Sequence, residues 1–113
     1  MPEHNGELMS RIRSLMKEQQ LYTNVDLKVS DVAAELGTNS RYVSECIKTQ
    51  EGCTFNRFVN KYRLEHVKRL LREAPDRKLS SIAIEAGFAN EQSFHRTFKQ
   101  ETGTTPGEWK NSQ

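Results

Sequence analysis

The sequence has no apolar run that approaches the roughly 18 residues of a membrane span. Its opening residues, MPEHNGEL, also lack the apolar stretch of a signal peptide. We therefore expect this domain to make no membrane contact and to be cytoplasmic. With 113 residues, of which 35% are hydrophobic and 28% charged, the chain has the composition of one modest globular domain, which two small lobes can share.

Cysteine is scarce, and the spacing of Cys46 and Cys53 is not the C-x-x-C of a metal site. The three histidines, His4, His66 and His95, form no recognisable metal set with them. We predict two reduced thiols, no metal and no cofactor. No Ser/His/Asp order, glycine-rich phosphate loop or carboxylate pair stands out, so we predict that the protein is not an enzyme.

A large excess of one charge is also lacking, because the net charge is only +2. The segment 54–73 nevertheless holds six Lys or Arg residues against two Glu residues. Such a basic strip attracts phosphate groups even when the whole chain is nearly neutral. A solvated helix face explains the same pattern, and both interpretations stay open at this point.

Apolar residues recur at helical spacing, and no stretch keeps the two-residue alternation of a strand. The pattern predicts an all-α fold with seven helices. We expect them at about 6–20, 31–36, 40–51, 54–73, 81–86 and 91–102, with a last helix that begins at residue 106. The expected N-caps are Ser30, Asn39, Ser80, Asn90 and Thr105. Pro106 at the first helical position and Glu108 in a capping box strengthen the last of these starts.

Two segments of the chain, 27–58 and 77–109, repeat each other. They align at an offset of 50 residues before a turn and 51 after it, since the second copy has one extra turn residue. The matched pairs include Val29 with Leu79, Ala33 with Ala83, Gly37 with Gly87, Asn39 with Asn90, Ile47 with Phe98, and Phe58 with Trp109.

Each copy has the plan of a helix-turn-helix. A small alanine allows close packing of a second helix, a glycine makes the turn, and an asparagine begins the second helix. A single copy is explained equally well by an ordinary αα-hairpin, whereas two copies in register favour DNA binding. We predict a disordered extension at 1–5, a first helix-turn-helix subdomain at 6–53, a linker helix at 54–73 and a second subdomain at 74–113. This arrangement is homeodomain-like.

The second helix of each copy exposes polar residues once its core positions are subtracted. In a helix-turn-helix these residues face the bases of double-stranded DNA. Arginine binds guanine O6 and N7 in bidentate fashion, glutamine does the same to adenine, and lysines one turn further on suit phosphates. We predict base contacts for Arg41, Ser44, Glu45, Gln92, His95 and Arg96, and phosphate contacts for Ser40, Lys48 and Lys99, whereas Ser93 lies at the border between the core and the groove.

Three of these assignments stay open. Glu45 either accepts from cytosine N4 or holds Arg41, which lies four residues back on the same face. His95 either contacts a base or is a solvated surface histidine. Arg96 suits a guanine or a phosphate.

The long helix at 54–73 suggests how two such motifs are spaced. Twenty residues at 1.5 Å each give a length of about 30 Å. Successive major-groove surfaces on one face of B-DNA lie about 34 Å apart. We therefore expect one monomer to contact two adjacent segments of DNA.

At these residues the sequence resembles the AraC/XylS family of bacterial transcription regulators, over about residues 8–110. The first copy carries a looser form of the family pattern and the second its most specific form. The residues of the pattern are Ala33, Gly37, Val43, Ile47 and Gly52 in the first copy, and Ala83, Gly87, Phe88, Phe94, Arg96, Phe98, Lys99, Gly103 and Pro106 in the second.

The resemblance implies two helix-turn-helix subdomains that each insert one helix into the major groove. It places base contacts at Arg41, Ser44, Glu45, Gln92, Ser93 and Arg96. It also implies RNA polymerase as a partner, action on the nucleoid, and a separate sensing or dimerisation region in the full-length protein. The opening residues resemble the output domain of hybrid two-component regulators. Glu45 departs from the basic or amide residue that is usual at its position.

A helical protein-docking module that does not bind DNA is the alternative function. Such a module needs apolar exposed helix faces, and the faces predicted here are polar and charged. Gel-shift binding that weakens with salt but survives competitor DNA separates the two functions.

Overall fold

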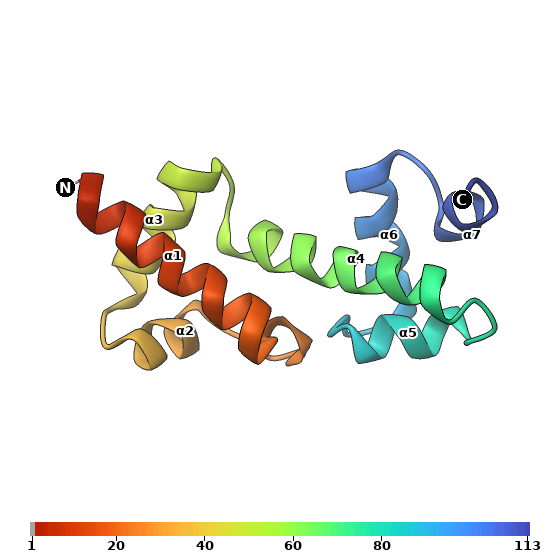
Figure 1. Cartoon of the computed structure of the whole chain (residues 1–113), viewed down its shortest axis with the longest axis horizontal. Coiled ribbons are helices and arrows are strands. Elements are labelled where there is room, and N and C mark those ends of the chain that lie inside the picture. Colours follow the sequence, from red (N-terminus) through yellow and green to blue (C-terminus); the bar gives the residue numbers. More distant parts are fainter. Residues whose placement is uncertain (1) are drawn as a thin grey trace. The chain divides into compact units, whose positions relative to one another are not determined.

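Seven α-helices and one 3₁₀ turn make up the computed structural model, which describes the backbone of residues 2–113 and the side chains of residues 5–113 (Figure 1). The elements are α1 (Pro2–Gln19), η1 (Leu21–Thr23), α2 (Val29–Leu36), α3 (Ser40–Glu51), α4 (Phe55–Glu73), α5 (Leu79–Glu85), α6 (Glu91–Thr102) and α7 (Pro106–Asn111). The all-α prediction is confirmed. The chain forms two units, which divide after Val59, inside α4.

The internal repeat is also a repeat of hydrogen bonds at helix starts. The Asn39 side chain accepts from the amide of Tyr42 at 3.0 Å, and the Asn90 side chain accepts from the amide of Ser93 at 2.7 Å. The next helix of each unit begins with a threonine cap: Thr54 accepts from Arg57, and Thr105 accepts from Glu108, both at 3.2 Å. Helices α3 and α6 therefore begin at the predicted residues and have the same length of 12 residues.

The turn before each of these helices needs a glycine. Gly37 has φ 68° and Gly87 has φ 108°, a region that favours glycine because it has no Cβ atom. The residue after each glycine donates its amide to a buried alanine carbonyl, Thr38 to Ala33 at 3.0 Å and Phe88 to Ala83 at 3.1 Å. The matched pairs seen in the sequence are thus matched in backbone geometry.

Two of the predicted caps are wrong. Helices α2 and α5 begin at Val29 and Leu79, so Ser30 and Ser80 lie inside the first turn. At α2 the Asp31 carboxylate accepts from the amide of Lys28 at 2.8 Å. A carboxylate three residues into the helix replaces a serine as the group that satisfies the backbone at this start.

Helix α1 extends further toward the N-terminus than the sequence analysis predicted. It begins at Pro2, so the backbone of residues 2–5 is helical where we expected a disordered extension, and Met1 lies outside the described residues. The fixed φ of proline suits the first helical position, where its missing N–H costs no hydrogen bond. The connection after α1 contains the 3₁₀ turn η1.

In the first unit, α1 packs against α2 and α3 and covers their apolar faces (Figure 1). The largest fully buried side chains of this unit are Met9, Ile12, Met16, Val32, Val43, Cys46 and Ile47. Two arginines of α1 also bind the ends of the other helices. Arg11 donates to the carbonyl of Leu36 at 3.2 Å, and Arg13 donates to Glu51 at 3.1 and 3.2 Å.

Both cysteines are buried free thiols of this unit. The Cys46 thiol donates to the carbonyl of Asn5 at 3.1 Å. Burial raises the pKa of the Cys46 thiol, an effect that nearby Arg13 opposes. The neutral thiol is therefore favoured, in keeping with a role for Cys46 in packing.

The second unit has its own apolar core. Its buried residues are Leu64, Val67, Leu71, Ile82, Ala83, Ala86, Phe88, Phe94 and Phe98. Trp109 joins α7 to this core: its ring meets Phe98 edge-on at 6.1 Å, and the Arg72 guanidinium lies 5.0 Å from the ring centroid. Phe58 occupies the matching place in the repeat and is 3% exposed.

Candidate nucleic-acid interface

The outward face of α3 carries an ion pair between two of the predicted base-contacting residues. Arg41 Nε donates to Glu45 Oε1 at 3.1 Å, and their side chains are 82% and 60% exposed. Of the two roles left open for Glu45, the structure shows the contact with Arg41. The bond uses Nε and not one of the two terminal nitrogens of Arg41.

The other predicted residues of α3 divide by exposure. Ser44 and Lys48 are exposed, whereas Ser40, the first residue of the helix, is half-buried. Tyr42, the residue after Arg41 in the first turn of α3, is 58% exposed and was not among the predicted site residues.

The outward face of α6 presents Gln92, Arg96 and Lys99, which are all exposed. Ser93 is half-buried, and its amide donates to the Asn90 cap. Ser93, like Ser40, therefore lies at the edge of its exposed helix face.

His95 has contacts on two sides. Its Nε2 lies 3.9 Å from Glu91 Oε1, one turn before it, and its ring meets that of Phe94 edge-on at 5.3 Å. The side chain is 46% exposed. It therefore remains on the α6 surface while its ring packs against a core residue.

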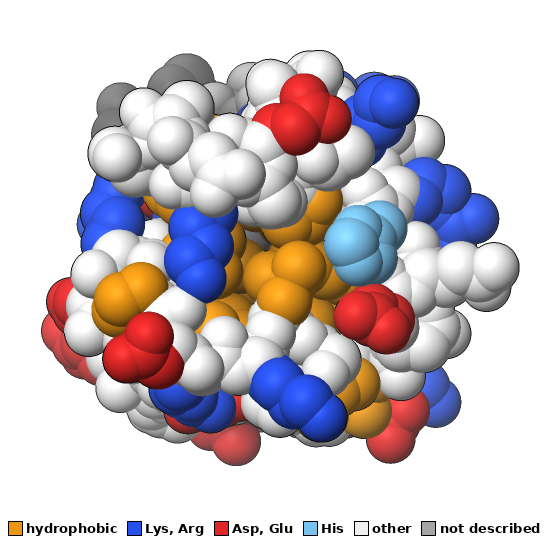
Figure 2. Space-filling view, turned by 90° about the vertical axis from the view of Figure 1, so that its right-hand side faces the viewer, with side chains coloured by type: hydrophobic (Ala, Val, Ile, Leu, Met, Phe, Trp, Pro, Cys, Tyr) orange, Lys and Arg blue, Asp and Glu red, His pale blue; other side chains and the backbone are white. Residues whose placement is uncertain are grey.

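A depression of about 390 Å³ lies beside these α6 residues. It is lined by His95, Arg96, Lys99, Gln100 and Thr105. Three of these five side chains are basic types, but the surface that lines the depression is almost entirely apolar. Figure 2 looks onto the end of this second unit and shows charged side chains of both signs around a hollow with hydrophobic side chains.

The basic strip of α4 is partly neutralised by its own helix. Lys68 lies 3.4 Å from Glu65 and Arg69 lies 4.0 Å from Glu73 on the same helix, whereas the Arg72 guanidinium lies over the ring of Trp109 on α7. Such pairs are typical of a solvated helix face. They favour the interpretation of segment 54–73 as a solvated helix face over that of a phosphate-binding strip.

A family model described as "Helix-turn-helix domain" matches residues 32–112, well over half of the chain. A solved structure described as an AraC-type DNA-binding regulator from Chromobacterium violaceum has the same fold, with a TM-score of 0.82 over 96% of this chain and 94% of that one, at 20% identity. The chain belongs to the AraC-type helix-turn-helix family. This family consists of DNA-binding domains of transcription regulators and not of enzymes.

Two relatives illustrate the family in sequence. The "Probable transcription factor PqrA" of Proteus vulgaris is 31% identical over 93 residues, which cover 82% of this chain and 75% of that protein. The transcriptional regulatory protein YesN of Bacillus subtilis is 31% identical over 111 residues, which cover 97% of this chain. The AraC-type chain described here spans only 30% of the length of YesN.

A second solved AraC-type structure belongs to a larger regulator. It is the C-terminal domain of AraT, a response regulator from Geobacillus stearothermophilus, with a TM-score of 0.79 and 25% identity. The match covers 91% of this chain and 85% of that one.

Among the residues that our structure describes, no helix is long and apolar enough to cross a bilayer.

Proposed function

We propose that this chain binds double-stranded DNA sequence-specifically, with α3 and α6 each inserted into a major groove, and thereby regulates transcription. The main support is the matched register of the two helices. Arg41 follows the Asn39 cap by two residues, and Gln92 follows the Asn90 cap by two residues. The same cap geometry thus presents a long polar side chain in the first turn of each helix, where a helix-turn-helix contacts base edges.

The chemistry of these side chains assigns the bases. We propose that Arg41 binds guanine O6 and N7 and that Gln92 binds adenine N6 and N7. Because Glu45 holds Arg41 through Nε, the terminal nitrogens are oriented before DNA arrives. Each bidentate contact contributes about 1–3 kcal/mol of discrimination against a wrong base. Ser44, His95 and Arg96 are to supply further base contacts.

Phosphate contacts are proposed at the edges of the same faces. Lys48 and Lys99 both lie nine residues after their asparagine caps and are exposed. Ser40 is proposed to donate its hydroxyl to a phosphate. Contacts of this kind fix the orientation of a protein on DNA without selecting a sequence.

The length of α4 supports the use of two grooves by one chain. Its 19 residues give about 28 Å at 1.5 Å per residue. Successive major-groove surfaces on one face of B-DNA lie about 34 Å apart. We therefore propose that one chain binds a single continuous DNA site that is not a palindrome.

The remaining proposals concern the cellular setting. The relatives are named as transcription regulators, and the chain spans a small part of YesN. We propose RNA polymerase as a partner, a sensing or dimerisation region elsewhere in the full-length protein, and a cytoplasmic location on the nucleoid.

The decisive experiment is selection of binding sites from a random pool of duplex oligonucleotides. Arg41→Ala and Gln92→Ala are each expected to lose the preference at one or two base pairs, with the two affected positions about 10 base pairs apart. Lys17→Ala, at an exposed position of α1, is the control and keeps both preferences. If both variants select the wild-type motif, Arg41 and Gln92 do not contact the bases as proposed.

A further inference from the structure

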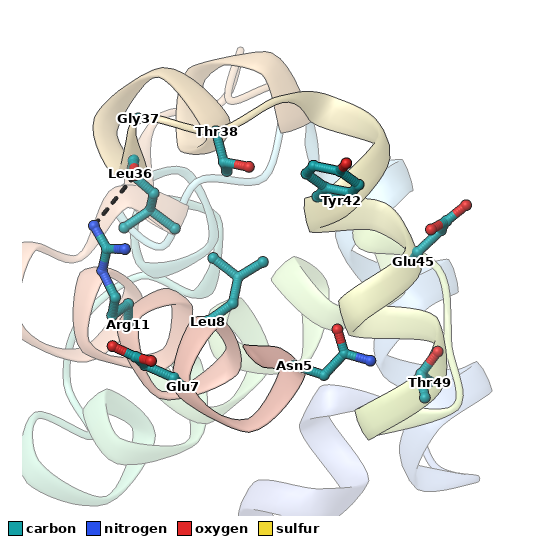
Figure 3. A pocket seen from close by; sticks show the side chains of 10 residues that line it. All are labelled: Asn5, Glu7, Leu8, Arg11, Leu36, Gly37, Thr38, Tyr42, Glu45 and Thr49. Atoms are coloured by element: carbon teal, nitrogen blue, oxygen red, sulfur yellow. Dashed lines mark hydrogen bonds between the residues drawn. The ribbon is translucent and has the colours of Figure 1, made fainter. Parts of the chain in front are cut away.

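The first unit contains a cavity that the proposed DNA contacts do not use. It has a volume of about 640 Å³ and lies between α1, the turn from α2 to α3, and α3 (Figure 3). Cavities that bind small organic molecules have volumes of about 300–1,000 Å³. The size of this one therefore suits a small molecule.

The lining of the cavity is about equally polar and apolar. Figure 3 shows Leu8 extending from α1 toward Thr38, with Leu36 to one side and the ring of Tyr42 to the other. The Thr38 hydroxyl and the Asn5 amide also line it. A ligand that has both an apolar body and a polar group matches a lining of both kinds.

The charges at the rim select the sign of that polar group. Among the described residues that line the cavity, two carboxylates, Glu7 and Glu45, and one guanidinium, Arg11, are charged, and Glu45 is already paired with Arg41. The guanidinium already donates to the Leu36 carbonyl at 3.2 Å (Figure 3). A cation that takes the place of Arg41 beside Glu45 therefore finds a complementary carboxylate at the rim.

Glu45 links the cavity to the recognition helix. In Figure 3 its carboxylate is turned away from Leu8, and it accepts the hydrogen bond from Arg41 at 3.1 Å. Both side chains are mostly exposed, and exposed ion pairs contribute little to stability. Exposed side chains change rotamer within nanoseconds, so a nearby cation can draw Glu45 away from Arg41.

We infer that this cavity binds a small organic monocation with an aromatic body, and that Glu45 is its counter-ion. The ring lies against Leu8, Leu36 and Tyr42, and the ammonium group binds the Glu45 carboxylate in place of Arg41. One consequence rests on the proposed function: the bound cation removes the group that orients Arg41, and so changes DNA binding.

Three probes of the same shape test the charge requirement. These are tryptamine, which is cationic, tryptophol, which is neutral, and indole-3-acetate, which is anionic. Each is titrated into the ¹⁵N-labelled chain without DNA. We expect amide shifts at Leu8, Thr38 and Tyr42 with tryptamine at about millimolar concentration, and binding at least about threefold weaker for tryptophol. Equal binding of all three probes, strongest binding of the anion, or no shift at these amides overturns the inference.

A matched pair of variants tests the counter-ion. Glu45→Gln is expected to weaken tryptamine binding about threefold, to the level of tryptophol. Glu35→Gln removes a carboxylate from an exposed site on α2 that does not line the cavity, and it is expected to bind tryptamine like the wild type. Both positions are exposed, so the amide spectra of the two variants should show an intact fold. Equal weakening by both substitutions contradicts a specific role for Glu45.

The DNA consequence is measured separately. Saturating tryptamine is expected to lower the affinity of the wild type for its selected duplex at least about threefold and to leave Glu45→Gln unchanged. If the chain binds no duplex at all, the proposed function fails while the amide shifts still decide the cavity. If tryptamine binds and lowers the affinities of both proteins equally, Glu45 is not the link.

Discussion

His66, on α4, has a buried imidazole close to charged side chains of the second unit. It is 6% exposed, and the Arg69 guanidinium lies 3.4 Å from its Nδ1. Burial lowers the pKa of His66, the nearby charges of Arg69 and Arg77 lower it further, and Glu85 opposes them. Arg77 and Glu85 themselves form an ion pair at 2.7 Å. The folded protein therefore holds this imidazole neutral.

This residue predicts how stability depends on pH. The unfolded chain takes up a proton on His66 near the ordinary pKa of 6.5, and the folded chain does so only at lower pH. The free energy of unfolding should therefore fall as the pH drops below about 6.5, by at most about 1.4 kcal/mol per pH unit for this one group. Urea unfolding at pH values of about 7.5 and 5.5 measures this change above the range in which carboxylates titrate.

Two substitutions identify the residue responsible. His66→Gln should flatten the pH dependence, even if it lowers the stability at both pH values. His95→Gln, at an exposed site on α6, should keep the dependence. A wild-type protein that is equally stable at both pH values would contradict this account of His66.

At the scale of single elements, the features that the sequence predicted are those set by residues a few positions apart, such as helix starts and exposed helix faces. Helices α3 and α6 begin after Asn39 and Asn90, as expected, because a cap and the amide it bonds lie three residues apart. The start of α2 was missed because serine is a common N-cap, which pointed to Ser30. In the structure the Asp31 carboxylate accepts the backbone hydrogen bond at this helix start. The outward faces of α3 and α6 followed from helical periodicity alone.

Features that join distant parts of the sequence were not predicted. Arg13 bonds Glu51 across 38 positions, and Arg11 bonds the Leu36 carbonyl across 25. No periodic or capping signal marks such pairs, because they depend on how α1 packs across the motif. The cavity beside α3 has the same origin, and only the folded chain brings Leu8 near Tyr42.

The two caps should contribute similarly if the repeat extends to energetics. Asn39→Ala and Asn90→Ala are each expected to lower the free energy of unfolding by about 1 kcal/mol, the usual cost of a lost N-cap. Asn39→Asp and Asn90→Asp should be close to the wild type, since aspartate caps equally well. Urea unfolding measures all four variants. An alanine variant as stable as its aspartate counterpart would show that the cap hydrogen bond contributes nothing.

At the scale of the whole molecule, the two units share one plan but have separate cores. The chain carries a net charge of only +2, so its overall field attracts DNA weakly. In the proposed complex, phosphate binding depends on the positions of individual basic side chains. Lys48 and Lys99 occupy the same position in their respective recognition helices.

The salt dependence of DNA binding counts these contacts. A plot of log Kd against log salt concentration becomes shallower by about one unit for each phosphate contact that is removed. Lys48→Ala and Lys99→Ala should each reduce the slope by about one and the double variant by about two, while base preference stays unchanged. Fluorescence anisotropy with the selected duplex at several salt concentrations measures the slopes, with Lys17→Ala as the control of equal charge. A slope that responds to one of the two lysines but not to the other would show that a single recognition helix reaches the DNA, and would contradict the two-groove proposal.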